Sequence, residues 1–184
     1  MNYKKFLKTL RPVKWGELGC EPFEDYKERV CRLLPNWPEG PLQDWLYRHH
    51  PDAVNHYGWL RFDRMVFQKD SWSTEQIYNQ VGSHIMDGIE GMGAKIYSST
   101  EWETTRLMRY FLENGTWPVP IILLDNRKNI VDPWGDHYGQ PYHLLEGHLR
   151  LGYFRNIYRR DYEKLKDVHE LWIVTIDQND TARV

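Results

Sequence analysis

The most informative part of this sequence of 184 residues is Tyr142-His143-Leu144-Leu145-Glu146-Gly147-His148-Leu149-Arg150-Leu151. The apolar residues before Glu146 are typical of a short strand, and the pattern after Gly147 is that of a helix running to Arg160. A glycine at such a junction allows a sharp backbone turn and, lacking a Cβ, leaves room for a ligand to approach. The stretch therefore predicts a strand, a tight turn and a helix.

The turn at Gly147 is the first candidate site. The free N–H groups of a helix's first turn and the positive end of its dipole attract anions. Arg150, one turn into the helix, could donate two hydrogen bonds to a phosphate or carboxylate. His148 could donate to the same anion or act as an acid or base, and Glu146 could act as a general base. Gly147, His148 and Arg150 are therefore candidate ligand-binding residues, and Glu146 and His148 are candidate catalytic residues.

Each of these residues also has a purely structural interpretation. Gly147 can serve as a turn glycine and His148 as a helix cap. Arg150 can pair with Glu146, four residues earlier, or with another acid on the helix face. Both interpretations stay open at the level of the sequence.

The segments on either side of this stretch predict an α+β fold. Before it, a helix ends at Asn114-Gly115, and a run rich in β-branched residues follows Pro118. After it, residues 171–176 alternate as a strand does. We expect one small mixed sheet with helices, whose strands lie at about 119–124, 142–145 and 171–176.

In this order of elements the chain resembles the ParB/sulfiredoxin-like superfamily, whose ParB members carry the pattern in their N-terminal domain. The pattern is a helix ending in Asn/His-Gly, a strand beginning near Pro, a second strand, Gly-x-x-Arg opening a helix, and a last strand. Here it reads Phe111-Leu112-Glu113-Asn114-Gly115, Val119-Pro120-Ile121-Ile122-Leu123, Tyr142 to Arg150, and Leu171-Trp172-Ile173-Val174. The resemblance covers about residues 95–177, which is under half of the chain.

The resemblance implies a nucleotide or another phosphate-bearing ligand, with or without magnesium, at Gly147-His148-Leu149-Arg150. The corresponding turn of ParB proteins reads Gly-Glu-Arg-Arg and contributes to CTP binding. Gly147 and Arg150 match it, while His148 and Leu149 depart from it. Only 34 residues follow Arg150, so we do not expect the helix-turn-helix region of a chromosome-segregation ParB.

Sulfiredoxin chemistry is not expected. The turn of sulfiredoxins reads Gly-Cys-His-Arg and its cysteine is the nucleophile, whereas this chain has His148 at that position. Cys20 and Cys31 lie outside the motif, suit a reducing compartment, and indicate a cytoplasmic location. Their spacing alone leaves a single disulfide open.

The rest of the chain predicts an appended layer. We expect residues 1–94 to form a mainly helical, aromatic-rich extension packed on a core at 95–177, with a polar tail at 178–184. Its expected helices lie at 22–34, at about 42–49 with Pro51 closing it, and from the capping pair Ser73 and Gln76 to Ile85. The rings between Trp37 and Trp72 are either core residues or a protein-contact surface.

Three groups of polar residues have competing interpretations. The loop from Asp132 through Asp136 to His137, with His143 and His148, could bind a divalent metal, but its spacings match no metal signature and we assign none. Basic residues that follow the motif form either a patch for phosphate-bearing partners or a solvated helix face: Arg155, Arg159, Arg160, Lys164 and Lys166. We expect His49, His50 and His56 at the surface.

Composition limits the classes of function. The net charge of −2 excludes a generally basic nucleic-acid binder, and no apolar run approaches the roughly 20 residues of a membrane-spanning helix. The first hypothesis is a nucleotide- or phosphate-binding domain, with catalysis left open. The second is a non-enzymatic protein-binding module, such as a bacterial immunity or antitoxin protein. A nuclease is a weaker third, because it needs an acid/base pair and a metal that the sequence does not reveal.

Overall fold

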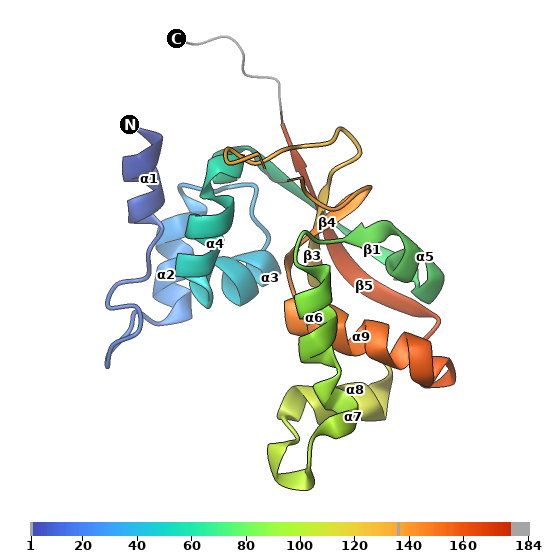
Figure 1. Ribbon diagram of the computed structural model, residues 1–184. Helices are drawn as coiled ribbons and strands as arrows, with labels where there is room; N and C mark the ends of the chain where they lie inside the picture. The colour runs from blue at the N-terminus through green and yellow to red at the C-terminus, as the bar shows by residue number, and fades with distance from the viewer. Residues whose placement is uncertain (1, 136, 178–184) are drawn as a thin grey trace. The chain divides into compact units, whose positions relative to one another are not determined.

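The computed structural model describes residues 2–135 and 137–177, and it divides into two compact units (Figure 1). The first unit is Met1–Phe67 with Val174–Val184, and the second is Gln68–Ile173. The division therefore differs from the expected one at residue 94, because residues 68–94 supply strands and helices to the second unit. The packing of the extension on the core stays a prediction, and the expected tail at 178–184 lies outside the described residues.

The α+β class and the mixed sheet are confirmed. Five strands follow the order β1-β5-β3-β4-β2, in which β4 pairs antiparallel with β3 and parallel with β2. Their bounds are Met65–Ser73 for β1, Val81–Gly82 for β2, Ile121–Asp125 for β3, Tyr142–Glu146 for β4 and Val168–Ile176 for β5. The three expected strands are β3, β4 and β5, and β1 and β2 come from the segment expected to be helical.

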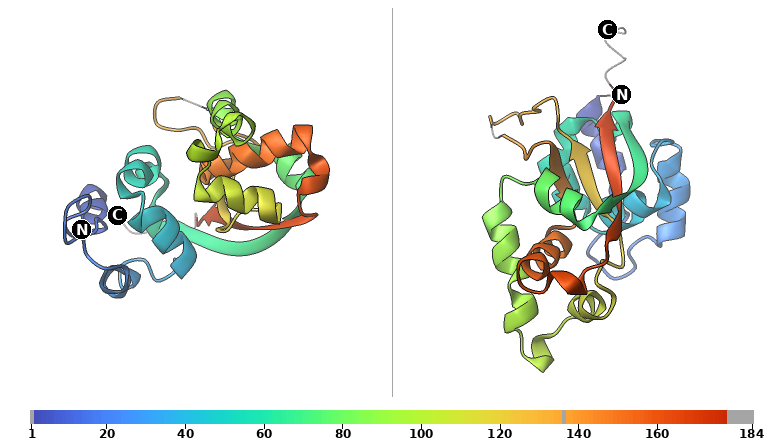
Figure 2. Two further views of the ribbon diagram at one scale, coloured as in Figure 1. Left: turned by 90° about the horizontal axis from the view of Figure 1, so that it is seen from below. Right: turned by 90° about the vertical axis from the view of Figure 1, so that its right-hand side faces the viewer.

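The helices of the second unit gather on the sheet. Figure 2 shows α6, α8 and α9 together on one side of the long strands β1 and β5. The bounds are Thr74–Gln80 for α5, Met86–Gly93 for α6, Lys95–Ser98 for α7, Arg106–Asn114 for α8 and His148–Arg160 for α9. Phe111, Leu144 and Phe154 are fully buried between these helices and the sheet, and each such side chain contributes about 1.5–3 kcal/mol.

Two glycines bring α6 and α9 into close contact. A Cβ added to Gly93 would lie 2.2 Å from the carbonyl carbon and oxygen of Gly152, and one added to Gly152 would lie 2.4 Å from the Ile89 oxygen. Asn156 locks the crossing, because its Nδ2 donates to Glu90 O and to Gly152 O, both at 2.9 Å. This crossing fixes α9, and therefore the Gly147 turn at its start.

The helix bounds in the second unit confirm one expectation and correct another. Asn114 ends α8, and Gly115 follows at φ +62°, as predicted. The capping box of Ser73 is present, but α5 ends at Gln80 because Val81 pairs with Tyr142 in the sheet. A further capping box, of Thr100 and Glu103, lies at a short 3-10 turn, and Thr105 caps α8.

The first unit is helical and closes on an aromatic core. Trp37 and Trp45 stack at 5.6 Å between centroids, and Phe62 packs edge-on against Trp37. All three rings are at most 5% exposed, so the core interpretation of these rings is confirmed. The elements are α1 (Tyr3–Thr9), α2 (Phe23–Cys31), α3 (Glu39–Pro41), a π-helical segment (Leu42–Tyr47) and α4 (His50–Tyr57), with short 3-10 turns to Arg64.

Two expectations around Pro51 are wrong. Pro51 does not end a helix but stands in the first turn of α4, where its missing N–H costs no helical hydrogen bond. His50 is 6% exposed, not at the surface. Burial lowers the pKa of His50 to about 4, so the ring is neutral at physiological pH.

Candidate functional site

The turn at Gly147 has the predicted shape. β4 ends at Glu146, α9 begins at His148, and Gly147 between them has a φ of +106°. Residues that carry a side chain rarely adopt this backbone conformation. A Cβ at this position would also lie 2.6 Å from Cγ2 of Ile121. Glycine is therefore required at this position by both the backbone and the packing.

Arg150 holds the turn from within. Its Nη1 donates to the carbonyl oxygens of Val119 at 2.6 Å and Pro120 at 3.1 Å, just before β3. Its Nη2 donates to Oε1 of Glu146 at 3.0 Å. The residue is only 9% exposed, so its guanidinium ties the first turn of α9 to the two strands beside it.

The same contacts define the role of Glu146. The side chains of Glu146 and Arg150 are 18% and 11% exposed, so the ion pair is largely shielded from water. The Arg150 guanidinium thus occupies Oε1 of Glu146 as a hydrogen-bond acceptor. This geometry supports the structural interpretation of Glu146 and Arg150.

The first turn of α9 has no side-chain cap, as is also the case for α2, α4 and α6. The side chains of Asn2, Ser73 and Thr105 cap α1, α5 and α8, whereas the cap residue of α9 is a glycine and offers no side chain. His148 and Leu149, the first two helical residues, are half-buried. The start of this 13-residue helix retains the donor groups and the dipole that the sequence predicted for an anion site.

His148 belongs to a group of three histidines. The buried ring of His143 stacks on Tyr138 at 4.0 Å and on His84 at 5.4 Å, and its Nδ1 accepts a hydrogen bond from Gly139 N at 3.0 Å. Burial, together with nearby His84 and His148, lowers the pKa of His143 to about 3. The neutral ring therefore carries its proton on Nε2.

Sequence reasoning missed His84 because it lies far from the motif in the chain. The parallel pairing of β2 with β4 sets Gly82 opposite His143, which carries His84 to the same place. No periodic or spacing signal in the sequence announces this pairing, since β2 is only two residues long.

The histidines do not form a metal centre in the described part of the chain. Among residues 2–135 and 137–177, no group of three His, Cys, Asp or Glu side chains is arranged to hold a metal ion. In the candidate loop, Asp132 Oδ1 accepts from Trp134 N at 2.9 Å, as in an ordinary turn. Asp136, which the metal hypothesis included, lies outside the described residues.

The basic residues of α9 are engaged by neighbouring side chains. Glu90 accepts from Arg155 at 2.6 Å and from Arg159 at 2.5 Å, and these contacts lower its pKa. The Arg160 guanidinium lies 4.9 Å from the centroid of the Tyr97 ring, and Lys164 pairs with Asp161 at 3.0 Å. Four of the five basic side chains are thus held by neighbouring side chains, which supports the solvated-face interpretation over a phosphate-binding patch.

Three surface hollows are formed by other segments. The first, of about 360 Å³, lies in the loop after α1, and the second, of about 210 Å³, lies around Arg61 and Arg64. The third, of about 410 Å³, is lined by Arg106, Arg109, Tyr110 and Glu113 on α8. None of the three includes a residue of the Gly147 turn in its lining.

Comparison with known proteins does not assign the chain to a family. No protein-family model matches it, and neither a curated protein nor a solved structure matches it at a significant level. None of the helices in the described part of the chain combines the length and apolar character needed to cross a bilayer.

Proposed function

We propose that this chain is a ParB/sulfiredoxin-like domain that binds a nucleotide or another phosphate-bearing ligand at the start of α9. The observation that carries the proposal is the junction at Gly147, where β4 passes through a positive-φ glycine into a helix whose cap residue has no side chain. The order of α8, β3, β4, α9 and β5 also agrees with the pattern expected for that superfamily.

The residues of the turn have distinct roles in this proposal. The backbone N–H groups of the first turn of α9 bind the anion, and the His148 side chain donates a further hydrogen bond. Arg150 is a positioning residue, because its guanidinium binds Val119 O, Pro120 O and Glu146. Any magnesium enters with the nucleotide phosphates, since no metal group is found among the described side chains.

Backbone amide resonances test where the ligand binds. We expect the amide signals of Gly147 and Leu149 to shift when CTP, ATP or GTP is added to the labelled protein, and inorganic phosphate to cause a smaller shift at the same amides. Signals from α8 serve as the internal control. Shifts confined to α8, or no shift at any amide, would contradict the proposed site.

A second candidate function is a non-enzymatic protein-binding module of the bacterial immunity or antitoxin kind. It is favoured by large apolar side chains that lie bare on ordered turns. Leu18 is 100% exposed and Trp102 is 96% exposed, and tryptophan is among the residues enriched at protein contacts. For a nuclease, no group of three His, Cys, Asp or Glu side chains that could hold a metal ion is found among the described residues.

The proposed location is the cytoplasm. Cys20 and Cys31 are both free thiols, which is the usual state in a reducing compartment. Measurement of the thiol content of the purified protein without reductant checks that both thiols are free.

A further inference from the structure

The loop of residues 10–22, between α1 and α2, is held in one conformation by Arg29. From α2, this residue donates through Nη2 to Arg11 O at 3.2 Å and to Oε2 of Glu21 at 2.6 Å. Its Nε donates to the other oxygen of Glu21 at 3.0 Å, and the guanidinium keeps the pKa of that carboxyl below its ordinary value. The Arg29 guanidinium therefore joins the two ends of the loop, through Arg11 O and the Glu21 carboxylate.

Further bonds fix the middle of the loop. Val13 N donates to Oε2 of Glu21 at 3.0 Å, and Trp15 Nε1 donates to Tyr47 O at 3.2 Å. The Tyr47 hydroxyl donates back to Glu21 O at 2.6 Å. The backbone also takes a left-handed conformation at Lys14, with φ +54°, which is unusual for a residue with a side chain.

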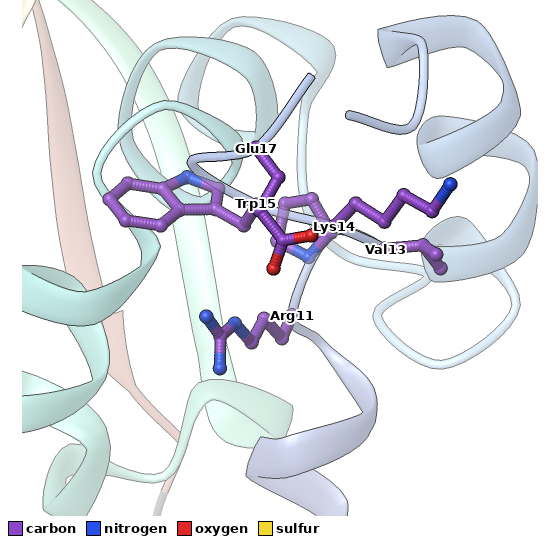
Figure 3. A pocket seen from close by; sticks show the side chains of 6 residues that line it. Arg11, Val13, Lys14, Trp15 and Glu17 are labelled. Atoms are coloured by element: carbon purple, nitrogen blue, oxygen red, sulfur yellow. The ribbon is translucent and has the colours of Figure 1, made fainter. Parts of the chain in front are cut away.

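This fixed loop surrounds the hollow of about 360 Å³, whose lining residues are Arg11, Pro12, Val13, Lys14, Trp15 and Glu17 (Figure 3). Figure 3 shows the Arg11 and Lys14 side chains pointing in different directions from the loop, with the Trp15 indole on the side opposite to Lys14. The hollow thus combines two cationic groups with one broad aromatic side chain.

The cations of the hollow differ from four other arginines of the first unit. Arg29, Arg32, Arg48 and Arg61 each pair with a carboxylate. In the described part of the chain, neither Arg11 nor Lys14 forms an ion pair or a side-chain hydrogen bond. With Glu17 as the one acid in the lining, the hollow has a net positive charge.

Apolar side chains on the same loop lie bare beside these cations. Leu18 is 100% exposed and Val13 is 57% exposed, although hydrogen bonds hold the loop internally. Gly16 and Gly19, with φ of +81° and +79°, provide the turns on either side of Leu18. A rigid loop loses little conformational entropy on binding, so such side chains suit a docking contact.

We propose that the loop 10–22 is a docking site for an acidic segment of a partner protein. Carboxylates of that segment pair with Arg11 and Lys14, and its aliphatic side chains pack on Trp15, Val13 and Leu18. The positive charge of Arg11 and Lys14 favours an acidic partner segment. The exposed side chains of Val13 and Leu18 favour a segment that also carries apolar residues. The proposal does not depend on the ligand site at α9.

Selection of peptides tests this proposal. A phage-displayed library of random linear peptides is selected on the full chain, with counter-selection on the double variant Arg11→Ala/Lys14→Ala. We expect the retained peptides to be enriched in Asp or Glu next to Leu, Ile or Phe. Each cation should account for about a tenfold change in Kd of a synthesised peptide, as loss of a charge-assisted hydrogen bond predicts.

Matched variants make the result decisive. Lys5→Ala on α1 removes one positive charge from an exposed position outside the hollow, and we expect it to leave Kd almost unchanged. Exchange of the peptide's Asp and Glu for Asn and Gln should abolish binding, while melting temperatures of all variants stay close to that of the wild type. No enriched peptides, peptides without acidic residues, or equal effects of Lys5→Ala and Lys14→Ala would overturn the proposal. Binding of a single-stranded oligonucleotide that depends on Arg11 and Lys14 would overturn it as well, since the occupant would then be a nucleic acid.

Discussion

Arg150 donates to Oε1 of Glu146 at 3.0 Å across the turn that joins β4 to α9. Because the same guanidinium also binds two backbone oxygens before β3, the arginine of the Gly-x-x-Arg motif fixes the position of the turn. The backbone N–H groups at the start of α9 are therefore already ordered by internal contacts. An anion that binds there does not have to order the turn, which favours binding.

Removal of this guanidinium should destabilise the second unit. Arg150→Ala removes the guanidinium partner of the shielded Glu146 carboxylate and one donor each from the oxygens of Val119 and Pro120. We expect a loss of about 3 kcal/mol in the free energy of unfolding, measured by denaturant titration. Arg32→Ala, which breaks a solvent-exposed pair with Glu28, is the control and should cost under about 1 kcal/mol. Equal effects of the two substitutions would contradict the assigned role of Arg150.

The crossing of α6 and α9 predicts opposite changes in stability for two alanine substitutions on α6. Gly93→Ala places a Cβ 2.2 Å from backbone atoms of Gly152, so it should destabilise the protein by at least about 1–3 kcal/mol. Gly91→Ala, on the same helix, meets no atom within 4 Å and should stabilise it by about 0.5–1 kcal/mol. Thermal unfolding of both variants checks the pair, and destabilisation by both would show that the crossing is not the cause.

Acid should weaken the fold through buried His169. Its Nε2 lies 2.9 Å from the hydroxyl of Thr74 and its Nδ1 lies 2.8 Å from that of Thr116. Thr74 donates to Lys166 O, so Nε2 carries the ring proton and Nδ1 accepts from Thr116. Burial lowers the pKa of His169 to about 4.

The sign of the pH effect follows from that lowered pKa. The unfolded chain binds a proton at His169 near its ordinary pKa of about 6.5, whereas the folded protein does so only near 4. The neutral His169 ring therefore contributes on the order of 3 kcal/mol to the free energy of unfolding above pH 6.5. This contribution is lost as the pH falls toward 4. Denaturant titrations at several pH values between 4 and 6.5 give the free energy of unfolding as a function of pH. This free energy should fall less steeply with decreasing pH for His169→Gln than for the control His56→Gln, whose ring is exposed. An unchanged slope for His169→Gln would contradict this assignment.

The local parts of the fold could be predicted from the sequence, and the long-range parts could not. The Gly147 junction and the end of α8 at Gly115 depend on neighbouring residues, so patterns of apolar residues and glycine reveal them. β2 was missed because Val81 fits a helical spacing with Ile77, and only pairing with Tyr142 shows that it is a strand.

The candidate site shows the same limit. The motif identified Glu146, Gly147, His148 and Arg150, but two acceptors of Arg150 lie about thirty residues earlier in the chain and are backbone atoms. A backbone carbonyl oxygen that accepts a hydrogen bond leaves no signal in the pattern of side chains. The loop 10–22 was likewise missed, since the bonds of Arg29 and Tyr47 that shape it are invisible in the sequence.

Calorimetric titration of the full chain with CTP, ATP and GTP, each with and without magnesium, is the most direct test of ligand binding at α9. We predict saturable binding of at least one nucleotide, weakened about tenfold by His148→Ala, as loss of one hydrogen bond to a charged group implies. His49→Ala, on an exposed ring in the first unit, should leave the affinity unchanged. Absence of heat for every nucleotide under both conditions, with the protein shown to be folded, would contradict the proposed function.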